Sequence, residues 1–345
     1  MALTLRTTKE TCMFTEAIEA ILRDRVTSEA VRAIENGGSA ESIWSAVEEA
    51  GFLELLTPES AGGAGLSLSA TEPIFTAFGR HAVPVPLAQS IAARALLRDT
   101  GVMAPAGMTT LAGTCRRHAD GSLEAPQVPF GMICDQVLAN VDGSLLLLDA
   151  TRAGREPAGV HGSSCGTLRW RPDAVPASLG SNGDEVLLFS AAIHAAAIAG
   201  AMDRVFAMTL QYCNDRSQFG KSIGKFQAVQ HQLSVMAQHV ASAGMASALA
   251  FCGPGAVPGR LATAIAKART SMAVPLIAST AHALHGAIGV TAEYDLQLYT
   301  RRLHEWRIAD GSETFWNRMV GSAALAREHG TIVDFARTAP YDVAA

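Results

Sequence analysis

Two long helical patterns meet at residues 212–230, and this corner constrains the fold more than any other stretch of the sequence. Residues 186–211 are apolar almost all round, which predicts a helix buried on every side. Phe219 and Gly220 then predict the end of that helix at a glycine stop. A second apolar stripe follows at helical spacing: Phe226, Val229, Leu233, Met236 and Val240. Two long antiparallel helices joined by a short turn are typical of a helical bundle.

Polar side chains at this corner suit an anion. Arg216, Gln218 and Lys221 stand within a few residues of the turn. A guanidinium can hold a phosphate or a carboxylate through two parallel hydrogen bonds, so an anion site is one interpretation of Arg216. A solvated arginine at an ordinary helix–helix corner is the alternative, and these residues alone do not decide between the two.

The rest of the pattern divides the chain into three predicted regions: residues 1–100 are helical, residues 101–183 form a reduced β-domain, and residues 184–345 form a helical bundle. A glycine-rich loop, residues 51–65, interrupts the first region. This loop fits neither the dinucleotide-binding fingerprint nor a P-loop, so we interpret it as a loop packed closely against other backbone. In the second region, short apolar runs between turn residues predict the strands of a barrel or a sandwich. These runs are residues 136–140, 145–149 and 167–170.

Charge and cysteine usage argue against several classes of protein. The net charge is -5 and no run of basic residues occurs, which argues against nucleic-acid binding. The six cysteines form no C-x-x-C pair and none has metal-ligand spacing with a histidine, so we expect reduced thiols, no metal and a cytoplasmic location. We expect no signal peptide, because the N-terminal residues lack a basic start followed by an apolar run. The apolar residues 186–202 include Ser190 and His194, which predicts a buried helix and no membrane span.

Three motifs occur along the chain. The first is Pro58-Glu59 followed by the glycines of 62–65, the second is RSQFGKSI at 216–223 followed by FQAVQ at 226–230, and the third is LHGAIGVTAE at 284–293. In this order and spacing they resemble the acyl-CoA dehydrogenase family. The resemblance implies a mainly α fold with a middle β-domain: an N-terminal helical domain, a small β-barrel or sandwich domain and a C-terminal four-helix-type bundle.

The resemblance also implies a reaction and its participants. The reaction is α,β-desaturation of an acyl-CoA, in which a base removes a proton and a hydride passes to FAD. An electron-transfer flavoprotein or a similar acceptor is implied as the partner that reoxidises the flavin. The residues implied to contact FAD are Arg216, Gln218, Phe219, Gly286, Gly289 and Ser312. Of these, the three corner residues are implied to reach the FAD of a neighbouring subunit, and the two glycines its pyrophosphate.

Asp310 is the residue that the resemblance implies as the catalytic base. It falls where many family members carry a glutamate in the motif E-G-T, and a desolvated carboxylate can remove the weakly acidic Cα proton of a thioester. The aspartate withdraws the carboxylate by one methylene, about 1 Å, which weakens the attack geometry. Capping of the next helix is the alternative for Asp310, and Glu313 is the fallback base. Some members place the base at a position that here is Ser190, and His194, one turn on, is interpreted as a core residue.

The predicted β-domain departs from the family pattern. Residues 111–119, LAGTCRRHA, stand where a T-E-P-x-A-G-S-D-like segment is expected, and the family's tryptophan-bearing strand is not visible. Three hypotheses stay open: an FAD-dependent dehydrogenase with its own active site, a non-catalytic subunit of a heteromeric dehydrogenase that lends corner residues to its partner, or a degenerate structural protein of the same fold. Because only 17% of the residues are charged, we expect a homo- or hetero-oligomer with another acyl-CoA dehydrogenase subunit.

Overall fold

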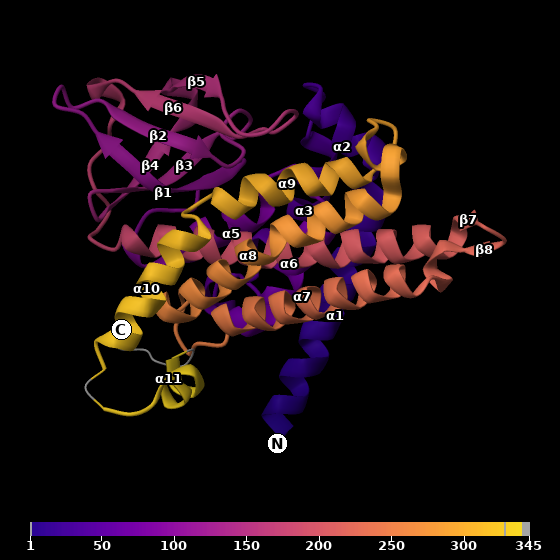
Figure 1. Ribbon diagram of the computed structural model, residues 1–345. Helices are drawn as coiled ribbons and strands as arrows, with labels where there is room; N and C mark the ends of the chain where they lie inside the picture. The colour runs from indigo at the N-terminus through magenta and orange to yellow at the C-terminus, as the bar shows by residue number, and fades with distance from the viewer. Residues whose placement is uncertain (1, 328, 340–345) are drawn as a thin grey trace.

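The computed structural model describes residues 2–327 and 329–339, and it confirms a mainly α fold with a central β-sheet (Figure 1). Among the described residues, a set of helices precedes the sheet and a bundle of long helices follows it. The N-terminal helices are α1 Ala2–Arg25, α2 Ser28–Glu35, α3 Glu41–Glu49, α4 Leu68–Arg80 and α5 Leu87–Leu97, with short 3-10 turns η1 Phe52–Glu54, η2 Glu59–Ala61 and η3 Arg98–Thr100.

The glycine-rich loop joins α3 to α4 and packs closely against backbone, as predicted. A Cβ built on Gly63 would lie 2.1 Å from the carbonyl oxygen of Thr57 and 2.6 Å from that of Glu54. No side chain fits at such distances, so only glycine allows this approach. The loop therefore serves the packing of the N-terminal helices.

The middle of the chain forms a six-stranded mixed sheet in the order β4-β3-β1-β2-β6-β5, which is open at both edges and is not a closed barrel. Strands β1 and β3 are parallel, and the other neighbours are antiparallel. The strands are β1 Thr109–Arg117, β2 Leu123–Val128, β3 Gln136–Val141, β4 Ser144–Asp149, β5 Gly154–Pro157 and β6 Gly166–Trp170, with η4 Ala150–Arg152 and η5 Pro172–Ala174. The predicted strands correspond to β3, β4 and β6. The others escaped prediction because β1 ends in polar residues, β2 contains Pro126, and β5 is four residues long.

Helix α6 is the central element of the bundle and packs against α4, α7, α8 and α9. It is long and apolar enough to cross a membrane by length and composition, as is the stretch Arg260–Val290, but 78% of the apolar window of α6 is buried inside the protein. The elements are α6 Asp184–Asp215, β7 Ser217–Gln218, β8 Lys221–Ser222, η6 Ile223–Lys225, α7 Gln227–Ala250, α8 Arg260–His285, η7 Gly286–Val290, α9 Leu296–Ile308, α10 Glu313–Leu325 and α11 Ile332–Thr338.

The corner between α6 and α7 differs from the prediction in one respect. Helix α6 ends at Asp215 with Arg216 as its C-cap, so Gly220 is not the helix stop. The chain instead forms a small β-hairpin, β7–β8, with Phe219 and Gly220 at its tip. Both tip residues have positive φ, 52° and 78°, which is the backbone that a tight two-residue hairpin turn requires. The antiparallel return into α7 is as predicted.

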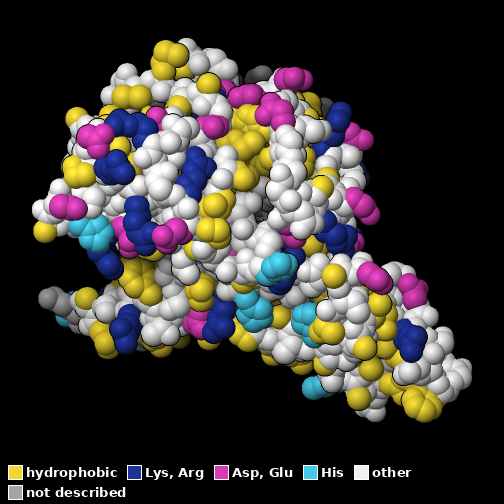
Figure 2. Space-filling view, turned by 90° about the horizontal axis from the view of Figure 1, so that it is seen from above, with side chains coloured by type: hydrophobic (Ala, Val, Ile, Leu, Met, Phe, Trp, Pro, Cys, Tyr) yellow, Lys and Arg dark blue, Asp and Glu magenta, His cyan; other side chains and the backbone are white. Residues whose placement is uncertain are grey.

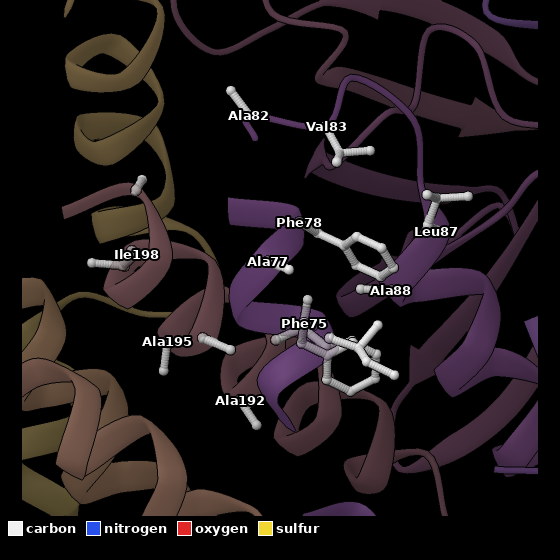
Figure 3. Close-up of a cluster of buried hydrophobic side chains, with 14 of the residues drawn as sticks. Phe75, Ala77, Phe78, Ala82, Val83, Leu87, Ala88, Ala192, Ala195 and Ile198 are labelled. Carbon is white, nitrogen blue, oxygen red and sulfur yellow. The ribbon is translucent and has the colours of Figure 1, made fainter. Parts of the chain in front are cut away.

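Helices α4 and α6 cross at backbone contact. A Cβ built on Gly79 of α4 would lie 2.1 Å from the carbonyl oxygen of Ala197, and one built on Gly200 of α6 would lie 1.9 Å from that of Thr76. Beside this crossing, Figure 3 shows the ring of Phe78 from α4 next to Ala88 of α5, in one buried hydrophobic cluster with Ala192 and Ala195 of α6. The crossing holds the N-terminal helices against the bundle and so shapes one wall of the site described next.

Candidate active site and the corner at the far end of the bundle

Asp310 lies in the turn between α9 and α10. Its φ of 53° is in the left-handed region, which few residues other than glycine adopt without support from their surroundings. The following residues are Gly311, which also has a positive φ, and Ser312, the N-cap of α10. The Ser312 side chain makes no capping hydrogen bond, and that of Asp310 is directed toward α6. The helix-capping alternative for Asp310 is therefore wrong.

Two residues of α6 hold one oxygen of the Asp310 carboxylate. The hydroxyl of Ser190 donates to Oδ2 at 2.6 Å, and Nδ1 of His194 lies 2.8 Å from the same oxygen. The side chains of His194 and Asp310 are only 3% and 10% exposed, so water screens this contact little. Because a carboxylate accepts, His194 is assigned the tautomer with its proton on Nδ1.

This grouping was missed in the sequence, although a signal existed. Ser190 and His194 are four positions apart and hence on one face of an otherwise apolar helix. A pair of buried polar residues with that spacing requires a polar partner. The interpretation of His194 as a satisfied core residue is correct as to its burial, but its partner is the candidate base.

The second carboxylate oxygen faces a crevice between the sheet and the bundle. A Cβ built on Gly113 of β1 would lie 2.9 Å from Oδ1 of Asp310. The crevice has a volume of about 210 Å³ and is lined by residues 111–114 of β1, residues 126–129 and residues 308–311. The arrangement thus holds Oδ2 with two hydrogen bonds and leaves Oδ1, beside Gly113, without a hydrogen bond among the described residues, as a proton acceptor requires.

The His194 ring also borders a smaller, mainly apolar pocket of about 30 Å³. Its walls come from α4, α5, α6 and α9 and include Phe75, Phe78, Ile193 and Trp306. At this volume the pocket has room for about one or two water molecules and not for the hydrocarbon part of an acyl group. The Asp310 turn therefore lies between a polar-edged crevice and an apolar pocket.

Glu313, the fallback base, is engaged elsewhere. The guanidinium of Arg307 donates to it through Nε at 3.2 Å and through a second nitrogen. The hydrogen bond from Arg307 holds the pKa of the Glu313 carboxyl below its usual value. A carboxylate whose pKa is lowered is a weak proton acceptor, so this geometry favours Asp310 over Glu313.

Around Asp310 the chain supplies only part of what a flavin dinucleotide needs. No lysine or arginine lines the crevice among the described residues, so the diphosphate has no cation to pair with there. Beside it, the loop of residues 158–165 is fastened to α9. Glu305 accepts hydrogen bonds from the Val160 backbone at 2.9 Å and from the Ser163 hydroxyl at 2.9 Å. The resident half of a cofactor site is thus closed in and lacks basic groups.

The corner residues are presented to solvent. Phe219 is 91% exposed at the tip of the hairpin, and Arg216 and Gln218 are exposed beside it. Within the described residues, the guanidinium of Arg216 makes no hydrogen bond or ion pair. The hairpin itself is braced, because the Lys221 ammonium lies 4.3 Å above the Phe226 ring and Phe219 meets that ring edge-on. Figure 2 shows this end as a lobe projecting at the right edge, with hydrophobic side chains at its tip.

Gly286 and Gly289 lie at the same end of the bundle as the corner. Tyr212, near the end of α6, stacks on His285 with ring centroids 4.5 Å apart. Nothing lies within 4 Å of a Cβ built on Gly286, so its backbone is open to a ligand, whereas Gly289 is packed against His285. Burial lowers the pKa of His285 and leaves this end without a buried histidine cation at neutral pH. The Arg216 guanidinium and the open backbone at Gly286 suit the phosphates of a dinucleotide, and the exposed Phe219 ring suits one of its ring faces.

The structure therefore divides the predicted site residues into two groups. Ser190 contacts Asp310, while Arg216 lies 26 residues further along the continuous α6, which at its rise per residue is about 39 Å away. Ser312 belongs to the Asp310 group, because it stands two residues after Asp310, and Gly286 and Gly289 belong to the corner group, because Tyr212 stacks on the preceding His285. One chain does not bring both groups to a single flavin dinucleotide.

Family models and relatives agree with this architecture. The model described as acyl-CoA dehydrogenase, N-terminal domain, matches residues 8–101, and that of the C-terminal domain matches residues 184–325. Acyl-CoA dehydrogenase IpdE2 of Mycobacterium tuberculosis is 30% identical over 301 residues, which are 86% of this chain and 91% of the relative. The IpdE2 of Mycolicibacterium smegmatis is 29% identical, over 84% and 90%.

Two solved structures of similar fold match almost the whole chain. A variant of the Tcur3481-Tcur3483 steroid ACAD superposes with a TM-score of 0.79 at 26% identity, and the match covers 96% of this chain and 99% of that one. The ChsE4-ChsE5 complex from Mycobacterium tuberculosis also has a TM-score of 0.79, at 21% identity, over 92% and 98% of the two chains. At 21% identity, the likeness to the ChsE4-ChsE5 complex shows a shared fold.

Proposed function

The chain belongs to the acyl-CoA dehydrogenase family, and from that premise we propose that it is one subunit of an FAD-dependent acyl-CoA dehydrogenase assembly and lends residues 216–219 to a flavin site on a neighbouring subunit. Members of this family are oxidoreductases that act on acyl-CoA thioesters. The observation that carries the proposal is the separation of about 39 Å between the exposed corner and the Asp310 turn along α6. Phe219 is exposed on a braced hairpin, which is expected of a side chain that contacts another subunit or its cofactor.

The Tcur3481-Tcur3483 relative supports two further parts of the proposal. Its name joins two designations, Tcur3481 and Tcur3483, which supports a heteromer with another acyl-CoA dehydrogenase subunit for this chain. It is a steroid ACAD, so an acyl-CoA with a ring system is the first substrate class to assay. An electron-transfer flavoprotein or a similar acceptor is the proposed partner for reoxidation.

A second role, proton abstraction in its own crevice, is favoured by the geometry of Asp310. In this role Oδ1 accepts the Cα proton of the thioester while Ser190 and His194 hold Oδ2. FAD, when bound, accepts the β-hydride. The loop of residues 158–165, fastened to α9 by Glu305, keeps water from the α9 side.

The corner assignment predicts the effect of Arg216→Ala. We expect FAD retention by the assembled complex to weaken by about 1.5–3 kcal/mol, roughly ten- to a hundredfold, because a hydrogen-bonded charge contact to the cofactor is lost. Arg216→Lys should restore only part of this, since an ammonium lacks the planar fork. Titration of the stripped complex with FAD measures the loss.

Lys225→Ala is the matched control, because this exposed lysine lies near the corner but outside the assigned contacts. It should leave FAD retention within a factor of about two. Equal retention by Arg216→Ala and Lys225→Ala would make Arg216 a surface residue and remove the main support for the proposal.

The assembly itself predicts a measurable association. Helix α7 contains no Asp, Glu, Lys or Arg in its 24 residues, yet part of it is exposed in the single chain. We expect this uncharged face to be covered by another subunit. Light scattering of the chain, alone and co-expressed with a full-length homologue, should show a stable oligomer. A stable monomer under both conditions would contradict the assembly.

A further inference from the structure

Lys267 of α8 is a charged residue with no exposed surface, and the proposed function does not use it. Removing an ammonium from water is costly unless its hydrogens find acceptors. Here all three do: Nζ donates to Oγ of Ser271 at 3.1 Å, to the carbonyl oxygen of Arg307 at 2.9 Å and to that of Gly311 at 3.2 Å. The lysine is therefore fully satisfied in the interior.

The two carbonyl acceptors stand on either side of Asp310. Arg307 is in the last turn of α9, where carbonyl groups lack helical partners and a cation is favourable. Gly311 follows Asp310 directly. One ammonium thus ties the end of α9 to the start of the next helix across the turn that carries the candidate base.

This turn needs such support because Asp310 is in the left-handed region. The Trp316 indole adds one bond by donating to the carbonyl oxygen of Asp310 at 3.1 Å. Ser271 adds another by donating to the carbonyl oxygen of Arg307 at 3.2 Å. Lys267 contacts both sides of the turn from α8, and the Arg307–Glu313 pair crosses the same turn.

We propose that Lys267 is a positioning residue: its ammonium fixes the turn of residues 307–311 and thereby aims the Asp310 carboxylate at the crevice. That Lys267 holds the turn follows from its hydrogen bonds to Arg307 and Gly311. That this serves catalysis rests on the proposed function of Asp310 as the base. Lys267 acts through the turn and does not touch the crevice, since it is absent from the crevice lining.

The Lys267 ammonium can lose its proton near neutral pH, because its pKa is lowered. Burial lowers its pKa to about 7, while the Asp310 and Glu313 carboxylates raise it and Arg307 lowers it further. His194, from α6, faces the same carboxylate of Asp310. When the ammonium loses its proton, the amine keeps two hydrogens for the two carbonyl oxygens but loses the charge that strengthens these bonds, so the turn should loosen as the pH rises through this region.

The test replaces Lys267 by methionine in the full chain within its assembled complex. Methionine has nearly the length of lysine, and Ser271 still donates to the Arg307 carbonyl, so the loss of the bond to the Gly311 carbonyl is not expected to unfold the protein. We expect residues 308–313 to lose hydrogen-exchange protection at least about tenfold, because two charged hydrogen bonds across the turn disappear. Lys267→Gln, which keeps one donor group, should give an intermediate loss and serves if the methionine variant misfolds.

Two controls on α8 separate positioning from general damage. Ser271→Ala removes one ligand of the ammonium and the hydroxyl's own bond to the Arg307 carbonyl, but it leaves both contacts of Lys267 across the turn, so its loss of protection should be smaller. Thr270→Val removes only bonds within α8 and should leave the turn unchanged. Unaltered protection in both Lys267 variants would overturn the inference.

A second readout tests what the turn is positioned for. With the partner's own base removed, the pH profile of flavin reduction should shift in Lys267→Met and not in Thr270→Val. A shift together with lost protection supports the inference. Lost protection with an unshifted profile would overturn the functional part and leave the corner proposal untouched, since Arg216 is tested by FAD retention alone.

Discussion

Replacing Asp310 by asparagine is expected to abolish acyl-CoA-dependent flavin bleaching in an assembled complex whose partner has lost its own base. The amide has nearly the same shape as the carboxylate but cannot accept a proton, and loss of general base catalysis costs about a hundred- to ten-thousandfold. The fold and the bound FAD should be retained. Stopped-flow absorbance of the flavin under anaerobic conditions measures the effect.

The neighbouring carboxylate provides the control. Glu313→Gln should retain most of the bleaching rate, because Glu313 is paired with Arg307. Ser190→Ala and His194→Gln should give intermediate losses, since each releases one hold on Oδ2. Unchanged bleaching in Asp310→Asn would remove the catalytic assignment. Bleaching that disappears only when the partner's base is removed would make this chain a helper.

Asp310→Glu addresses the length of the side chain. The resemblance predicts that a glutamate retains or raises activity by restoring the family's reach. Ser190 and His194 already meet the shorter carboxylate at 2.6 and 2.8 Å, so a longer side chain must displace them or advance into the crevice. Activity at or above that of the wild type would show that reach matters more than these two hydrogen bonds.

Gly200→Ala is expected to destabilise the protein by about 3 kcal/mol or more. The added methyl would lie 1.9 Å from the carbonyl oxygen of Thr76 and 2.8 Å from the backbone nitrogen of Arg80. Neither group can yield without separating α4 from α6, and overpacking of this kind is among the most costly substitutions. Urea unfolding followed by circular dichroism should show a large drop in the midpoint, or no folded protein.

Gly321→Ala is the matched control within a helix. Nothing lies within 4 Å of a Cβ built on Gly321 of α10, so the substitution should be neutral or should stabilise by up to about 1 kcal/mol. Similar midpoints for Gly200→Ala and Gly321→Ala would show that the α4–α6 crossing is not held at backbone contact.

Local patterns in the sequence determined most of the helical architecture. The apolar residues of 186–211 and the stripe from Phe226 to Val240 mark α6 and α7, because a helix is built from contacts three and four residues apart. The strands β3, β4 and β6 were predicted from their short apolar runs between turn residues, which is also a local pattern. The family resemblance supplied the identity of Asp310 and of the corner residues as site candidates.

Only the tertiary structure decided which of these residues act together. Ser190 and His194 meet Asp310 across 120 and 116 positions of sequence, and Lys267 meets Gly311 across 44. Such contacts depend on how the turn after α9 packs against α6 and α8, and no local period records that packing. The same long helix that the sequence predicts so clearly also sets Arg216 about 39 Å from Ser190. The Asp310 turn and the Arg216 corner thus lie at opposite ends of the helical bundle, because the continuous helix α6 separates them by its length.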